Sequence, residues 1–265
     1  KYNMLKKILL TTFVSLLVSF NVQAAKYIFK KDLWTNCNIL SDKDQSTLKN
    51  IDYKEEKKVK GWDRRKATAD GWSENFFTAF IFFSTFENGQ IITIRVNTEF
   101  KNKLEAKKQA MKYGKIYGQL PNFLRSNLNT ITIHKGKRSW GGGNNDILIH
   151  TQAKDYSNKK VGDCVEEIMI HESAHVSLDW SWGGSLKKKP WMEAAKADGI
   201  FISRYAKRYK KREDVAETIN WWIAVRCKPN SISKSDVKKI IEGIPNRLKY
   251  LDQQNFDTHP LKCNY

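Results

Sequence analysis

The chain has 265 residues, of which 40% are hydrophobic, so it can form one large domain or two small ones with a substantial core. Its formal net charge of +19 favours acidic partners such as anionic envelope polymers or acidic proteins, although a merely well-solvated surface explains the charge equally well. No nucleic-acid-binding motif accompanies the charge, so we expect no specific nucleic-acid partner.

The first residues have the pattern of a signal peptide. A basic segment at Met4–Lys7 precedes an apolar run at Ile8–Phe20, and Val22 and Ala24 are the small residues of a cleavage site. We therefore predict a signal peptide over residues 1–24 and a secreted or periplasmic mature protein. The apolar run is short for a membrane span, and we expect none after cleavage; an uncleaved anchor is the alternative.

The four cysteines form an even set, which in an exported protein predicts two disulfides with three possible connectivities. We prefer Cys227 with Cys263, because this bond would hold the C-terminal tail. Cys37 with Cys164 would then join the N-terminal segment to the region before residue 166. A thiolate zinc site is less consistent with the sequence, because no two cysteines are close together.

Residues 26–60 are polar and lysine-rich with weak periodicity, and we expect a partly ordered segment there. Two β-rich runs follow at 76–86 and 91–96. The Asn-Gly dipeptide between them predicts a hairpin, whereas a helix over the first run is the less favoured alternative. Residues 100–118 change to helical periodicity and predict an amphipathic helix.

Short strands are expected at 131–134 and 147–150, separated by a flexible glycine-rich turn at 141–145. The turn is not a phosphate loop, because neither Lys-Ser/Thr nor a helix follows it. Helices are predicted over 191–209 and 237–248, and either Ser233 or Ser235 would cap the second of these.

A His-Glu-x-x-His motif at residues 171–175 lies between these predicted strands and the predicted C-terminal helices. Apolar residues at helical spacing surround it, and residues four apart share one helix face, so His171 and His175 can direct imidazole nitrogens at one point. Such a pair suits zinc, which binds histidine at about 2.0–2.1 Å. Glu172 would lie beside the metal and accept a proton from water. Asp179 could hydrogen-bond His175 or serve only at the helix end. The alternative, a buried helix whose histidines bind backbone carbonyls, leaves Glu172 unexplained.

A catalytic zinc needs a third protein ligand and an open position. The metzincin continuation, His-x-x-Gly-x-x-His, is excluded because Leu178 and Ser181 occupy its Gly and last His positions. The remaining common source is a carboxylate on a later helix. Glu213 and Glu217 lie four residues apart before an apolar segment that begins at Ile219, which argues against two exposed helix acids.

The order strands, backing helix, strands and His-Glu-x-x-His helix resembles the zincin metallopeptidases. The segment from Glu213 to Glu217 resembles the Glu-x-x-Ala-Glu segment of gluzincin-like peptidases, including the anthrax lethal factor type. This resemblance covers about residues 100–225. It implies an α+β zincin-like domain with a small mixed sheet, a backing helix, an active-site helix and C-terminal helices. It also implies that Glu213 binds one catalytic Zn²⁺ and that Glu217 orients a ligating histidine; the reverse assignment is the alternative.

Two further roles follow from the same resemblance. A tyrosine upstream of the glutamate donates to the oxyanion of the tetrahedral intermediate; Tyr205 matches this role better than Tyr209. An edge strand above the cleft binds an extended peptide by strand addition, and residues 147–151 are our candidate. His150 in this strand would either point into the cleft or have no special role.

Together these features predict a secreted zinc metallopeptidase whose substrate is a peptide or protein, with acidic sequences favoured by the basic surface. The predicted organisation is a signal peptide at 1–24, an N-terminal extension with a β-hairpin at 25–98, and a catalytic domain at 99–265. A hydrolase of cell-wall peptides or amides is one alternative. The other is a non-catalytic secreted binding protein with a zinc site, against which the intact Glu172 argues.

Overall fold

The computed structural model describes residues 26–30, 39–66, 74–153 and 164–265. The predicted signal peptide lies outside these residues. Within them the protein is a mixed α+β structure with a six-stranded sheet and eight α-helices. None of these helices is both long enough and apolar enough to pass through a lipid bilayer.

The main sheet has the strand order β2-β3-β4-β5-β7-β6, in which β4, β5 and β7 are parallel and the other neighbours are antiparallel. A separate small sheet pairs β1 with β8 in parallel. The strands are β1 (Lys26–Phe29), β2 (Leu48–Trp62), β3 (Glu74–Phe86), β4 (Ile91–Asn97), β5 (Thr130–His134), β6 (Gly141–Gly143), β7 (Asp146–His150) and β8 (Ile200–Ser203). The predicted N-terminal extension therefore supplies β2, β3 and β4 to the same sheet that contains β5, β6 and β7.

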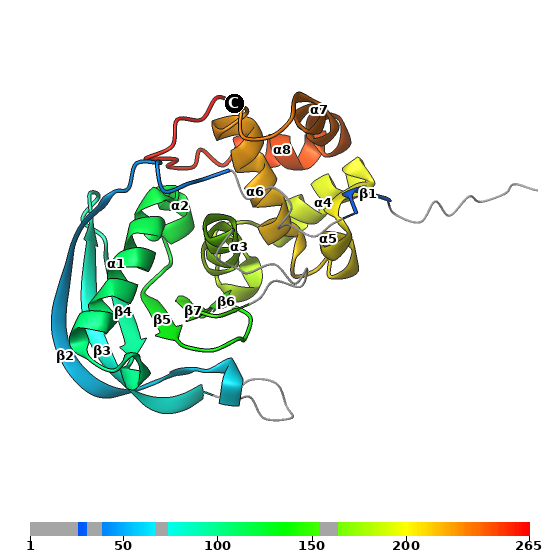
Figure 1. The fold of residues 1–265 in the computed structure, drawn as a ribbon. Coiled ribbons are helices and arrows are strands. Elements are labelled where there is room, and N and C mark those ends of the chain that lie inside the picture. The colour runs from blue at the N-terminus through cyan, green and yellow to red at the C-terminus, as the bar shows by residue number, and fades with distance from the viewer. Residues whose placement is uncertain (1–25, 31–38, 67–73, 154–163) are drawn as a thin grey trace, which may run out of the picture.

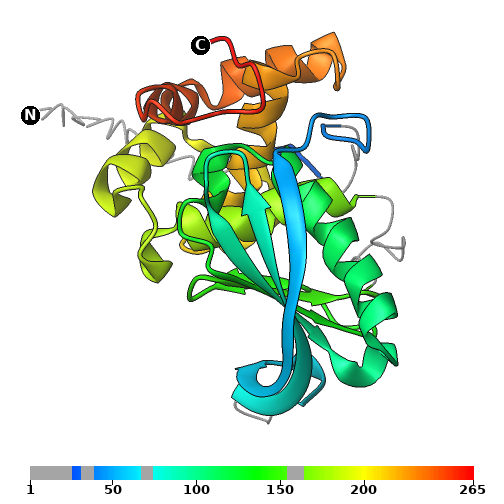
Figure 2. The same cartoon turned by 90° about the vertical axis from the view of Figure 1, so that its left-hand side faces the viewer.

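The helices divide into two groups around α3. Figures 1 and 2 show α1 and α2 on the side of the curved sheet and α4 to α8 on the opposite side of α3. The helices are α1 (Lys103–Gln119), α2 (Asn122–Arg125), α3 (Val165–Ser177), α4 (Lys188–Asp198), α5 (Arg204–Arg208), α6 (Asp214–Cys227), α7 (Lys234–Gly243) and α8 (Pro245–Asp252).

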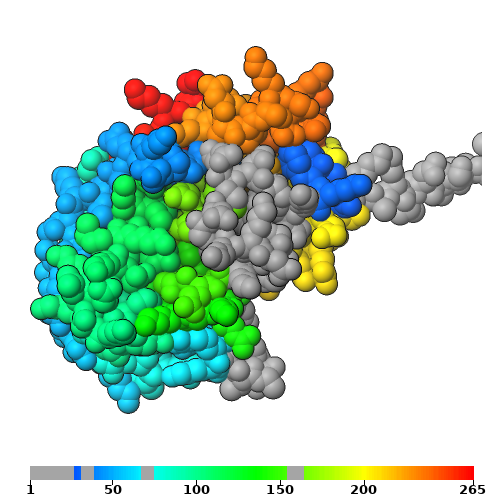
Figure 3. Space-filling view, in the orientation of Figure 1, coloured from blue at the N-terminus to red at the C-terminus, as the bar shows by residue number. Residues whose placement is uncertain are grey.

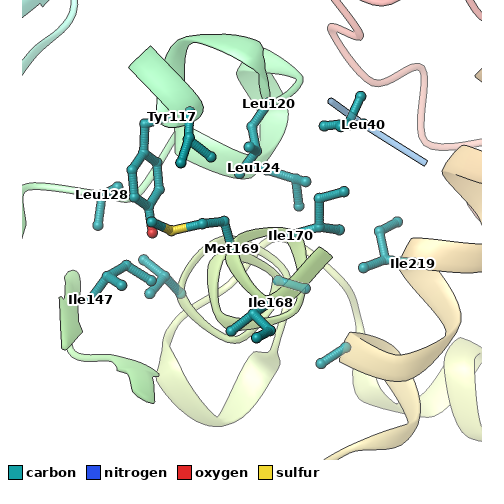
Figure 4. Close-up of a cluster of buried hydrophobic side chains, with 14 of the residues drawn as sticks. Leu40, Tyr117, Leu120, Leu124, Leu128, Ile147, Ile168, Met169, Ile170 and Ile219 are labelled. Carbon is teal, nitrogen blue, oxygen red and sulfur yellow. The ribbon is translucent and has the colours of Figure 1, made fainter. Parts of the chain in front are cut away.

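Helix α3 lies at the centre of the core. Its Ile168, Met169 and Ile170 are buried against side chains of α1, α2, β7 and α6 (Figure 4). Eleven of its thirteen residues are buried, so it has no wide solvent-exposed face. The polar side chains that a helix in such a position buries need partners. The buried His171 and His175 are therefore the residues of α3 that most need a physical explanation.

Several predicted elements are confirmed. Strands β3 and β4 form the predicted hairpin, with Gly89 in the turn at a φ of 82° that an L side chain rarely adopts. The expected helices and strands at α1, β5, β7, α3 and α6 are present. Ser233 caps α7, since its Oγ accepts a hydrogen bond from the Asp236 amide at 3.0 Å. The Cys227–Cys263 disulfide is confirmed. Cys37 lies outside the described residues, so its pairing with Cys164 stays a prediction.

Two expectations need correction. The expected partly ordered segment at 26–60 is regular over much of its described part, because residues 48–60 belong to the 15-residue strand β2; residues 31–38 lie outside the described ones. Most side chains of β2 are exposed, which explains the weak periodicity, and pairing with β3 supplies the order instead. Residues 141–145 are not simply a flexible turn, because residues 141–143 form β6.

Two predicted C-terminal helices are interrupted. The helix predicted over 191–209 ends before Gly199, whose φ of 64° stops α4, and the apolar residues after it form β8. The helix predicted over 237–248 is divided into α7 and α8. Pro245 begins α8 rather than weakening the end of one helix, because a proline at the first helical position loses no hydrogen bond.

A buried ion-pair network holds the C-terminal helices together. The guanidinium of Arg247 on α8 is fully buried. Its Nε lies 2.9 Å from Asp198 Oδ2 and its Nη1 lies 2.6 Å from Asp214 Oδ1. Trp191 Nε1 also donates to Asp214, at 3.1 Å. The network joins α8 to α4 and to the start of α6.

Replacing Arg247 by Ala should destabilise the protein by about 3–5 kcal/mol, because two buried carboxylates lose their cation. Urea unfolding followed by circular dichroism measures this loss. Lys239→Ala is the control: it removes an exposed pair with Asp236 and should cost less than about 1 kcal/mol. Equal losses in the two variants would contradict the account.

Candidate metal centre

Three buried side chains, two from α3 and one from the residue before α6, converge on one point. Glu213 Oε2 lies 3.2 Å from His171 Nε2 and 3.1 Å from His175 Nε2. The two Nε2 atoms lie 3.3 Å apart. Ligand atoms at about 2.0–2.1 Å from a tetrahedral zinc ion would be about 3.3–3.4 Å from one another. The three atoms therefore have nearly the spacing of one face of a tetrahedral zinc site, and His₂Glu is a donor set that zinc accepts.

The packing of α3 against α6 brings these residues together. His171 and His175 lie one turn apart on α3, and their rings are 4.9 Å apart at an interplanar angle of 81°. Glu213 is the residue immediately before α6. Buried apolar residues of α6, including Ile219, hold its first turn against α3. The structure thus places the predicted pair of histidines and the predicted glutamate within one group that could hold a metal ion.

The opposite nitrogen of each imidazole faces a carboxylate. His171 Nδ1 lies 3.5 Å from Glu217 Oε1, and His175 Nδ1 lies 3.5 Å from Asp179 Oδ2. Ser203 Oγ donates to the other oxygen of Glu217 at 2.5 Å. Metal-binding histidines are commonly oriented by a carboxylate on their second nitrogen. The geometry therefore groups Glu213 with the two Nε2 atoms and places Glu217 behind His171.

Arg212 was not predicted from the sequence. Its Nε donates to Glu213 Oε1 at 2.8 Å, which leaves Oε2 directed at the histidines. Glu213 and, to a smaller extent, Tyr205 raise the pKa of Arg212 against the effect of burial, so Tyr205 is linked to the same group. Tyr209 instead lies against Tyr205, with the guanidinium groups of Arg208 and Arg212 over its ring. No motif spacing identifies Arg212, because its role depends on the turn before α6.

The pKa shifts of Glu213 and His175 both favour the charged form of the side chain. Burial alone would raise the pKa of Glu213, but its hydrogen bonds with His171 and His175 hold that pKa well below its usual range. Burial alone would lower the pKa of His175, but Asp179 and Glu213 raise it to about 10. The centre therefore attracts positive charge, and a metal ion binding there would compete with protons.

Glu172 lies next to this group but is not one of the three converging residues. Its carboxylate favours the protonated form of His175 through charge, which places it close to the centre. The residue is partly exposed, and no described residue donates a hydrogen bond to its side chain. It is therefore an available carboxylate beside the candidate centre.

Among the described strands β6 is the edge strand next to α3, so the prediction of residues 147–151 as the edge strand is wrong. Residues 147–150 belong to β7, which lies between β5 and β6. The reversal occurs at Asn144 and Asn145, which have φ values of 49° and 59° as a tight two-residue hairpin requires. This turn type was missed because the glycines before it were interpreted as loop.

Gly142 allows β6 to lie directly on α3. A Cβ atom at this position would be 2.0 Å from the carbonyl oxygen of Glu172, so both backbones would have to separate. We expect Gly142→Ala to lower stability by about 1–3 kcal/mol, as overpacking does, and to move Glu172 relative to β6. Thermal unfolding and hydrogen exchange of the α3 amides measure these effects. Unchanged stability and exchange would show that the contact is not as close as described.

His150 is not part of the candidate centre. It is fully buried at the end of β7, where its Nδ1 lies 3.2 Å from the carbonyl oxygen of Lys135 and its ring stacks on His134. Burial is the main cause that lowers the pKa of His150 to about 4. The hydrogen bond with the Lys135 backbone raises that pKa by less, and the nearby charges have smaller effects. The ring is therefore a neutral part of the sheet, which agrees with the interpretation that gave it no special role.

No family model, curated protein or solved structure matches this chain. The function is therefore argued from the candidate centre and its surroundings.

Proposed function

We propose that the protein is a zinc-dependent metallopeptidase with a zincin-like catalytic domain. The main support is the convergence of His171 Nε2, His175 Nε2 and Glu213 Oε2 at separations of 3.1–3.3 Å. The second support is Glu172, which the His-Glu-x-x-His motif places beside that point without making it a ligand. A purely structural zinc site has no need of such a carboxylate.

In the proposed mechanism His171, His175 and Glu213 hold the ion. A zinc ion held by these residues would lower the pKa of a water molecule and would polarise a substrate carbonyl. Glu172 accepts a proton from the attacking water and returns it to the leaving amine. Tyr205, which contributes to the raised pKa of Arg212 beside Glu213, is the candidate donor of a hydrogen bond to the developing oxyanion. Glu217 and Asp179 keep the two imidazoles oriented.

The substrate would lie beside β6 as an extended chain. β6 is the last strand of the sheet on this side in the described part of the chain, and it contacts α3 at Glu172. An extended peptide paired with β6 would therefore pass Glu172 and the candidate centre. Export of the protein is supported by the Cys227–Cys263 disulfide, because such bonds persist in oxidising compartments.

A peptide-library digest tests this proposal. The mature protein is loaded with zinc, treated with a chelator, and reloaded, and products are identified by mass spectrometry at each stage. We expect cleavage that stops on chelation and returns with zinc. Cleavage restricted to cell-wall peptides or amides would favour that alternative substrate class. Stoichiometric zinc without cleavage of any substrate would favour a non-catalytic binding protein.

A further inference from the structure

A basic groove lies between α1 and the start of β2. Its volume is about 900 Å³, and none of its lining residues belongs to α3 or α6, which form the candidate metal centre. Figures 1 and 2 show α1 beside β2, and Figure 3 shows both at the surface on one side of the molecule. Five lysines line the groove: Lys49, Lys107, Lys108, Lys112 and Lys115.

The α1 wall is a single stripe of the helix. Leu104, Lys108, Met111 and Lys115 recur at spacings of three and four residues, which places them on one face. Leu104 is 65% exposed and Met111 is 45% exposed, although both are large and apolar. The stripe therefore combines positive charge with apolar surface that no described residue covers.

The β2 wall is an edge of the sheet. β2 pairs with β3 on one side and is the last strand on the other, within the described ranges. Close packing fixes the two walls relative to each other. A Cβ atom on Gly114 would be 2.7 Å from Ile51 Cδ1, and one on Gly118 would be 2.2 Å from Ser46 Oγ. The groove is thus a preformed feature of the helix–strand junction.

The chemistry of the lining selects the kind of ligand. No acidic residue lines the groove, so an anionic partner meets five lysines, of which Lys108 also pairs with Glu105 on the same helix at 2.7 Å. No aromatic residue lines it either, whereas single-stranded nucleic acids are usually bound by stacking on aromatic side chains. The concave shape suits a narrow chain better than a flat membrane surface. Leu104 and Met111 suit apolar side chains, and a free strand edge suits an extended backbone.

We propose that this groove binds an extended acidic peptide segment of a protein partner, with carboxylates on the lysines and apolar side chains against Leu104 and Met111. The proposal does not depend on the metal centre. If the protein is a peptidase, the groove would hold a substrate away from the reacting bond. If it is not, the groove would still bind the same kind of segment.

The test is a binding measurement with a fluorescent peptide that alternates glutamate and leucine. The matched peptide has glutamine in place of glutamate. We expect binding of the acidic peptide only, weakening with salt, and an affinity at least about tenfold lower in Lys108→Glu/Lys112→Glu, because two attractive charges become repulsive. Met111→Glu should also weaken binding. Mass spectrometry of the recovered peptide checks that the peptide was not cleaved during the binding measurement.

Lys188→Glu/Lys189→Glu is the matched control, since it makes the same change in net charge on exposed positions of α4. Its affinity should stay within about twofold of the unmodified protein, because long-range charge effects are screened. Equal losses in the two double variants would overturn the proposal in favour of non-specific attraction. Tighter binding of a single-stranded oligonucleotide or of anionic vesicles, lost in the groove variant, would overturn the choice of a peptide.

Discussion

Replacing Glu172 by Gln should lower peptide hydrolysis by about 10²–10⁴-fold, the usual contribution of a general acid–base group, while one zinc ion per chain is retained. The amide has nearly the shape of the carboxylate but cannot accept the proton of the attacking water. Zinc should remain because the three converging atoms belong to His171, His175 and Glu213. The measurement pairs kcat/KM on a cleaved peptide with zinc content by elemental analysis.

Glu166→Gln provides the matched control. Glu166 lies on the same helix in its first turn and is not among the converging residues, so its amide variant should keep both activity and zinc. Equal activity in Glu172→Gln and the unmodified protein would rule out the proposed role. Loss of zinc together with activity in Glu172→Gln would instead make Glu172 part of the metal site.

Replacing Glu213 by Gln should have the largest effect on zinc affinity. The substitution removes the negative charge at the point where the two imidazoles meet, 3.1 and 3.2 Å away. We expect the zinc affinity to fall at least about 100-fold, because substituting a residue that only orients a metal ligand already lowers metal affinity by 10–100-fold. Competition with a chromophoric chelator measures the affinity, and kcat/KM should fall with it.

Glu217→Gln distinguishes the two possible assignments of the glutamates. Glu217 lies behind His171, with Ser203 on its second oxygen, so its loss should cost about 10–100-fold in affinity. A larger loss in Glu217→Gln than in Glu213→Gln would reverse the assignment. Unfolding of both metal-free variants must be measured as well, because a folding defect would also lower the apparent affinity.

The sequence was most informative where chemistry depends on local spacing. The four-residue interval between His171 and His175 is sufficient to predict a shared face, and the structure brings their nitrogens to 3.3 Å. Glu213 is 38 residues further along the chain and could be chosen only through the resemblance to a known motif. Arg212 could not be chosen at all, because its contact with Glu213 depends on how the chain turns into α6.

The fold was predictable where one strong local signal applied. The Asn-Gly turn identified the β3–β4 hairpin, whereas the exposed β2 has no comparable pattern and owes its form to pairing with β3. Strand order also depends on distant contacts, so β6 was assigned to a loop and β7 to the edge. Gly199 shows a related failure, since its φ of 64° ends α4 at a position where the apolar periodicity continues.

The most direct test of the metal centre is a crystal structure of the zinc-loaded protein with anomalous data collected on both sides of the zinc absorption edge. The account predicts one strong zinc peak in contact with His171 Nε2, His175 Nε2 and Glu213 Oε2, with the Glu172 carboxylate beside it and not bound to it. A peak elsewhere, or no peak with both histidines hydrogen-bonded only to protein groups, would contradict it.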